Sequence, residues 1–244
     1  MEIDSASGRF TTAWRDELAR VSADLARFQP RFVESYRRLV SLEAWKTHLL
    51  EGRISSASLG FFLEAQNDGL VSHVLASLGS WRSALKSLRS CIENVCFCLY
   101  YMDHPVELSL WSIGKHALTH SAVLEYLQRH PSVSTVPKSV SGLEIIKKEY
   151  PVLSRAVHAS AVGFRMTAEE TGVRLWHTDQ GKLGAWSTRE LQTLCGINLL
   201  LLTMFRSELE GARLEGLRKA VSLAIPATRH KDVKQHLKVT LRKT

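Results

Sequence analysis

Three polar residues that could perform acid–base chemistry on a phosphate lie close together in the run YPVLSRAVHAS, residues 150–160. His158 follows Ser154 by four positions and Arg155 by three, so a helix would place them on neighbouring parts of one surface. Histidine exchanges protons near neutral pH, and arginine binds phosphate oxygens. The spacing fits a catalytic element, and it also fits a helix that carries a hydrogen-bonded histidine in its core.

A second group of charged residues follows helical spacing in the run WRSALKSLRSCIEN. Arg82, Lys86, Arg89 and Glu93 recur at steps of four, three and four, which predicts one polar stripe along a helix. Most such stripes face solvent. Arg89 and Glu93, however, lead into the apolar run VCFCLYYM, where an ion pair would be partly desolvated. A pocket is one reason for placing an ion pair there.

The motifs that identify familiar enzyme classes are missing from the sequence. It has no glycine-rich phosphate loop, no GxSxG elbow, no paired CxxC and no HExxH, which argues against common nucleotide, acyl-transfer and zinc chemistry. His116 and His120 are four residues apart in a helix predicted over 105–128, but no third ligand accompanies them. The sequence therefore predicts no metal and no cofactor.

Positive charge is concentrated at the C-terminal end of the sequence. The net charge is +8, and residues 226–244 hold six Lys or Arg residues against Asp232, which gives +5. Four of these basic residues are candidate phosphate ligands: Arg229, Lys231, Lys234 and Lys238. Such a segment attracts nucleic acid without reading its sequence. A solvated end that aids solubility is the alternative interpretation.

Hydrophobic spacing predicts an all-α, single-domain helical bundle over residues 1–225, followed by a basic tail over 226–244. Residues 130–141 are rich in Ser and Pro and predict a surface loop. Residues 171–186 break the helical pattern and predict a small hairpin or an ordered loop. Ser187 and Glu190 have the spacing of a capping box, which predicts a helix start there.

Several features indicate a cytoplasmic protein with no membrane partner. The first residues, MEIDSASGRF, contain acids and no apolar segment of the secretory type. The most apolar runs, 95–102 and 197–205, have roughly half the ~20 residues that a membrane helix needs. Four cysteines without a disulfide framework favour a reducing compartment.

Two segments together resemble HEPN-like helical proteins of bacterial phage-defence and abortive-infection systems. They are LRSCIENVCFCLYYMDHPVE and EYPVLSRAVHAS, and the resemblance covers about a quarter of the chain. It implies a helical bundle, often a homodimer, with an RNA-cleaving site in many members. It also implies a polar pocket around five residues: Arg89, Glu93, Tyr100, Ser154 and His158.

The sequence departs from the catalytic pattern of that group. Catalytic members carry an arginine, four to six intervening residues and then a histidine. Here only Arg229 with His236 fits, and that pair lies outside the two resembling segments. The missing motif in these segments argues against RNA cleavage.

Two functions remain open for a component of an antiphage system. In the first, the protein is a metal-independent endoribonuclease, with His158 as acid or base, assisted by Glu93, and with Arg89 or Arg155 stabilising phosphate charge. In the second, it is a non-catalytic helical subunit that binds a partner protein or nucleic acid, RNA more than DNA. Arg89, Glu93 and His158 would then form a packing network.

Overall fold

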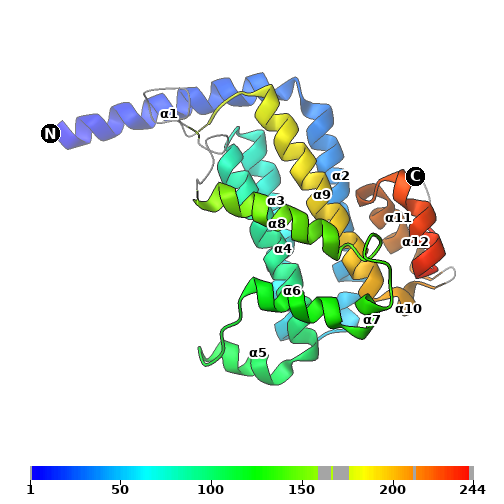
Figure 1. Ribbon diagram of the computed structural model, residues 1–244. Coiled ribbons are helices and arrows are strands. Elements are labelled where there is room, and N and C mark those ends of the chain that lie inside the picture. Colours follow the sequence, from blue (N-terminus) through cyan, green and yellow to red (C-terminus); the bar gives the residue numbers. More distant parts are fainter. Residues whose placement is uncertain (1, 159–165, 167–175, 211–212, 242–244) are drawn as a thin grey trace.

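The structure is a computed structural model of the 244-residue chain, and it describes residues 2–158, 166, 176–210 and 213–241. Figure 1 shows the arrangement of its helices. The helices are α1 (Glu2–Ala26), α2 (Gln29–His48), η1 (Leu50–Gly52), α3 (Ser56–Ser77), α4 (Trp81–Asp103), α5 (Pro105–Ser112), α6 (His120–Arg129), α7 (Pro131–Ser134), α8 (Leu143–His158), α9 (Gln180–Met204), α10 (Arg206–Leu209), α11 (Glu215–Ala224), η3 (Ala227–Arg229) and α12 (His230–Leu237).

The core is built around α9, whose second half is enclosed on every side. All residues from Thr193 to Met204 are buried, whereas a helix at a surface buries only one stripe. Helices α2, α4 and α8 pack against α9, and α3 pairs with α4 along its length. The described residues form helices and connections without strands, so the prediction of an all-α single-domain bundle is confirmed.

Side-chain caps mark where several helices begin. The Ser55 hydroxyl accepts a hydrogen bond from the Ser58 amide at 3.2 Å and opens α3. The Asp179 carboxylate accepts one from the Lys182 amide at 2.9 Å and opens α9. The predicted helix start at Ser187 was therefore wrong, because Asp179 satisfies the free amides two turns earlier.

The single helix predicted over 105–128 is two helices in the structure. α5 ends at Ser112, Gly114 follows with φ +71°, and α6 begins only at His120. A glycine adopts that left-handed conformation without a steric penalty, which turns the chain. His116 thus lies outside any helix, and the shared face predicted for His116 and His120 does not exist.

Residues 130–142 are more ordered than predicted. They contain the short helix α7, and they end at Gly142, whose φ is +79°. A Cβ at Gly142 would lie 2.3 Å from the carbonyl oxygen of Gly196. Only glycine fits this approach, which brings the start of α8 onto α9.

Helix α8 continues through Pro151, although a proline interrupts helical hydrogen bonding. The residue before it, Tyr150, therefore keeps a helical conformation that the sequence did not favour. In the region predicted as a hairpin or loop, residues 176–179 have no regular structure and 180–186 belong to α9. The remaining residues of that region, 171–175, lie outside the described part.

Polar contacts in the core join α2, α3 and α9. Nη2 of Arg38 lies 2.6 Å from Oε2 of Glu190, with both side chains at least nine-tenths buried. Burial raises the pKa of Glu190 to about 7, although Arg38 acts in the opposite direction. The indole N–H of Trp45 donates to Oδ1 of Asn198 at 2.9 Å. These bonds satisfy polar groups that would otherwise be costly inside the core.

Residues 226–241 fold against the rest of the bundle. Val233, Leu237 and Val239 are fully buried, and Nη1 of Arg218 donates to the Thr240 carbonyl at 3.0 Å. The separate tail predicted from residue 226 onward stays a prediction, but its described part has a defined structure. No helix in the described ranges has the length and apolar character needed to cross a bilayer.

Candidate functional site

The two segments that resemble one group in sequence lie next to each other in the fold. Nε of Arg82 donates to the Ala156 carbonyl at 2.9 Å, and Nε of Arg89 donates to the Ser154 hydroxyl at 3.1 Å. Residues later in α4 thus meet residues earlier in α8 where the two helices cross (Figure 1). This packing brings polar side chains from both segments together.

Arg89 is the centre of this group. Its Nη2 donates to the Tyr150 hydroxyl at 2.6 Å, and its Nη1 donates to Oε2 of Glu93 at 3.0 Å. The Tyr150 hydroxyl donates in turn to Oε1 of Glu93 at 2.7 Å. The side chains of Arg89 and Glu93 keep about a quarter and a fifth of their surface exposed, 25% and 21%. The network is therefore partly shielded from water.

His120 of α6 adds an unsatisfied group to the network. Its ring stacks on Tyr150 with centroids 3.9 Å apart, and only 7% of the residue is exposed. Neither ring nitrogen has a hydrogen-bond partner among the residues that the structure describes. Burial, assisted by the positive charge of Arg89, lowers the pKa of His120 to about 4. The imidazole is thus neutral at physiological pH.

Tyr150 is also held in its neutral form. Burial and its hydrogen bond to Glu93 raise the pKa of Tyr150 to about 12, with Arg89 acting in the opposite direction. We call these five residues, Arg89, Glu93, His120, Tyr150 and Ser154, the Arg89 cluster. Arg89 donates to three different side chains, and both carboxylate oxygens of Glu93 are bonded. The cluster is therefore a closed network rather than an open site.

Arg155 and His158 lie outside this network. Both are exposed on α8, and neither forms a hydrogen bond or ion pair to a described residue of the cluster. Arg82 donates hydrogen bonds to the carbonyl oxygens of Ala156 and Val157 at the end of α8. The last carbonyls of a helix have no partner within the helix, and Arg82 supplies one. The structure thus separates His158 from Arg89 and Glu93, which the sequence had grouped with it.

Tyr100 also has other neighbours than predicted. It is buried near the end of α4, where its ring stacks on His104 at 4.0 Å and lies 5.2 Å from that of Tyr126. The Tyr126 hydroxyl donates to Asp103 at 2.8 Å, and the Asp103 carboxylate also lies 3.3 Å from Nε2 of His130. Tyr100 thus belongs to an aromatic group between α4 and α6.

The predicted basic ligands are divided by the fold. Lys231, Lys234 and Lys238 are exposed, and they follow each other at steps of three and four while Val233 and Leu237 face inward. We call them the α12 basic stripe. No ion pair joins them to an acid within the described part of the chain. Arg229 is instead half-buried and donates to the Ser139 carbonyl at 3.1 Å.

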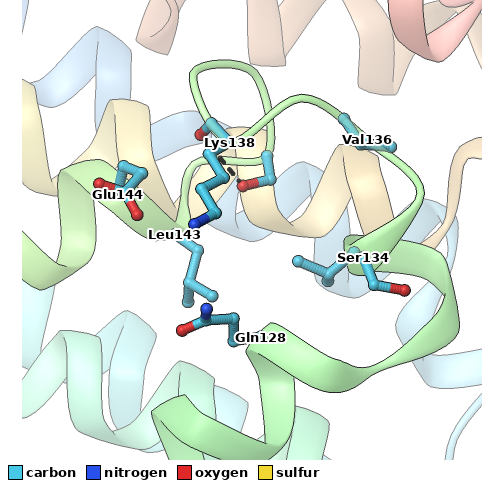
Figure 2. A pocket seen from close by; sticks show the side chains of 8 residues that line it. Gln128, Ser134, Val136, Lys138, Leu143 and Glu144 are labelled. Atoms are coloured by element: carbon cyan, nitrogen blue, oxygen red, sulfur yellow. Dashed lines mark hydrogen bonds between the residues drawn. The ribbon is translucent and has the colours of Figure 1, made fainter.

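A pocket lies between α6, α7, the loop before α8 and the start of α8 (Figure 2). Its volume is about 210 Å³. Val133, Val136 and Leu143 supply buried apolar walls. Gln128, Ser134, Lys138, Ser141 and Glu144 supply polar groups.

His120 and Tyr150 belong to the cluster, but the sequence had not indicated them as site residues. Tyr150 precedes Ser154 by one helical turn, so their common face could have been found if α8 had been predicted to continue through Pro151. His120 lies about 30 residues from Arg89 and Tyr150 in either direction, and no spacing rule joins them. Its place depends on the turn at Gly114.

Comparison with protein-family models, with curated proteins and with solved structures found no match to this chain. Among the described residues, no group of three or more His, Cys, Asp or Glu residues has the geometry of a metal site.

Proposed function

We propose that this protein binds RNA as a HEPN-like helical component of a bacterial antiphage system. One observation carries the RNA-binding part: Lys231 and Lys234 stand on a folded helix whose other face is buried in the bundle, and Lys238 caps the end of that helix. Lysines on a fixed surface bind a phosphate backbone with less loss of conformational freedom than lysines on a loose tail. The defence role rests on the two resembling segments, which are neighbours in the fold.

The Arg89 cluster has a structural role in this proposal. Its hydrogen bonds join α4 to α8 and engage all three guanidinium nitrogens of Arg89 within the protein. A closed polar network fixes how two helices pack and is costly to break at one member. This arrangement favours RNA binding over RNA cleavage.

The RNA-binding test replaces Lys231, Lys234 and Lys238 with Gln together. Each lost phosphate contact lowers the slope of log K against log salt by about 0.7 for single strands, so we expect the slope to fall by about 2. Fluorescence anisotropy of a labelled single-stranded RNA at several salt concentrations measures it. The matched control replaces three arginines with Gln in the same way. They are Arg9, Arg15 and Arg20, and they belong to α1, which lies at the other side of the molecule (Figure 1).

An unchanged salt slope in the α12 variant would contradict the proposal. Equal losses in the α12 variant and the α1 control would show a general effect of net charge and no defined surface. Melting temperatures of all three proteins show that each is folded.

RNA cleavage is the second candidate, and the exposure of His158 beside Arg155 favours it. A histidine that acts as acid or base must reach the substrate, and His158 is open to solvent. Labelled RNA is incubated with the wild type and with His158→Ala. Cleavage that disappears in a folded variant would support the nuclease, whereas cleavage of equal rate would remove His158 from the reaction.

A homodimer is the assembly that we propose for this protein. Five apolar side chains lie on α2 and α3 and are 40–56% exposed: Val33, Tyr36, Val40, Leu70 and Val74. Their three-and-four spacing suits helix packing, and Tyr36 contacts His73 of α3. A face made of two helices, each ~30 Å long and ~10 Å wide, has an area of roughly 600 Å². Stable complexes bury ~800 Å² on each partner, so this face is of comparable size.

The dimer is tested by sedimentation of Tyr36→Lys against Val106→Lys, an exposed apolar residue of α5. We expect only Tyr36→Lys to shift the wild type towards the monomer. A monomeric wild type would remove this assembly and leave RNA binding untouched.

A further inference from the structure

The pocket of Figure 2 combines apolar walls with polar groups that have free hydrogen-bonding capacity. Val133, Val136 and Leu143 are buried and form the walls. Lys147 donates to Oε1 of Gln128, which leaves the amide nitrogen of Gln128 as a donor. Lys138 is exposed, and Figure 2 shows its ammonium group above Leu143. It forms no ion pair with a described acid.

The volume of the pocket limits what it can hold. About 210 Å³ equals roughly seven times the ≈ 30 Å³ that a water molecule occupies in the liquid. Pockets for drug-sized ligands measure about 300–1,000 Å³. A single planar ring system with hydrogen-bonding edges is of the right size.

The polar groups match the edge of a nucleobase. Gln128 offers an N–H donor and Glu144 a carboxylate acceptor, so a ring edge with one acceptor and one donor satisfies both. Lys138 lies at the mouth of the pocket, where a phosphate attached to the ring would be placed. Unstacked bases are read in RNA through such edges.

The surroundings of the pocket favour a polyanion. Arg229 donates to the Ser139 carbonyl at 3.1 Å, which holds η3 against the loop that carries Lys138. The α12 basic stripe follows directly after Arg229 in the chain. A strand bound along that stripe would therefore have the pocket beside it.

We propose that this pocket binds one unstacked nucleobase, with Gln128 and Glu144 at the edge of the base and Lys138 at its phosphate. The base belongs either to an RNA strand on the α12 basic stripe or to a free nucleotide. If the base belongs to an RNA strand, the site rests on the proposed RNA binding. If the base belongs to a free nucleotide, it does not. Nucleobase recognition by this pocket is independent of any cleavage.

The experiment blocks the mouth of the pocket from an exposed position. Ser134 lines the pocket and is exposed, so Ser134→Trp adds a large side chain at its rim without replacing a core residue. Ser139→Trp is the matched control, since Ser139 is exposed on the same loop and does not line the pocket. Two probes of equal charge are a 12-nucleotide oligoadenylate and a ribose-phosphate 12-mer without bases. Adenosine monophosphate is the third probe.

We expect the wild type to bind oligoadenylate at least about fivefold more tightly than the baseless strand, the effect of one or two net hydrogen bonds. Ser134→Trp should remove this preference and keep the affinity for the baseless strand within about twofold. Ser139→Trp should behave as the wild type. An equal affinity of the wild type for both strands, or a preference that survives in Ser134→Trp, would overturn the site.

The outcomes separate this proposal from RNA binding in general. If the affinity for the strands depends on the α12 basic stripe but is unchanged by Ser134→Trp, the pocket proposal is refuted and the proposed RNA binding is kept. Adenosine monophosphate binding that Ser134→Trp abolishes, without strand binding, keeps the pocket and removes RNA as its source. Binding of none of the three probes overturns both.

Discussion

His120 should make the protein sensitive to mild acid, and replacing it should remove that sensitivity. The ring is buried against Tyr150, and no described residue forms a hydrogen bond with either nitrogen. Its pKa is about 4 in the folded protein, against an ordinary value of 6.5. As the pH falls, the unfolded chain takes up a proton at this residue first, so stability present above pH 6.5 is lost towards pH 4.

The size of the effect follows from the two pKa values. One pH unit between them changes the free energy of unfolding by about 1.4 kcal/mol. From pH 6.5 to pH 5 the wild type should therefore lose about 2 kcal/mol through His120 alone. His120→Phe keeps an aromatic ring on Tyr150, loses this dependence and removes two unsatisfied nitrogens. At pH 7 we expect it to be more stable by about 1 kcal/mol or more.

Urea unfolding at pH 7 and pH 5 measures both effects. His158→Gln is the control, because His158 is exposed and should leave the pH dependence unchanged. A His120→Phe protein that loses as much stability as the wild type at pH 5 would refute the reasoning. A large loss of stability at pH 7 would show that the imidazole nitrogens make bonds that the structure lacks.

Two further changes test the packing of α4, α8 and α9. Arg89→Met removes the guanidinium that donates to Glu93, Tyr150 and Ser154 and should lower the free energy of unfolding by about 2 kcal/mol. Lys86→Met, one turn earlier and exposed, should stay within about 0.5 kcal/mol. Equal urea midpoints would contradict this role. Gly142→Ala places a Cβ 2.3 Å from the Gly196 carbonyl oxygen, so its loss of folding stability should be well over the roughly 1–2 kcal/mol of left-handed backbone strain. Gly114→Ala, which has a similar φ and open space around its Cβ, should cost only that strain. Similar melting temperatures for the two variants would refute the close approach at Gly142.

Periodicity was sufficient to predict the helices that bury one clear stripe. α4 carries regular apolar spacing that is buried, and the bundle class followed from such helices. α3 differs, because its apolar Leu70 and Val74 are exposed while Ser58, Ala65 and Gly69 face inward. The errors occurred where one residue decides the outcome. Gly114 turns the chain, and Asp179 opens α9 two turns before Ser187. Such residues act through local backbone geometry and capping, which hydrophobic spacing does not record.

The candidate site was predicted in part. Arg89, Glu93 and Ser154 meet as expected, because each lies on the face of its helix that packs against the other helix. His158 lies one turn beyond Ser154, where α8 ends and its surface opens to solvent. His120 reaches the cluster from a third helix. Which helix covers a given face is a long-range property, and a single sequence holds no spacing rule for it.

The enclosure of the second half of α9 has a consequence for how the molecule opens. Amides buried on every side exchange with solvent deuterium only when the whole fold opens, so residues 193–204 report global unfolding. Residues 3–10 of α1 are exposed, and their amides exchange by local fraying. Transient opening at the margin can therefore proceed while the helices that pack against α9 remain closed.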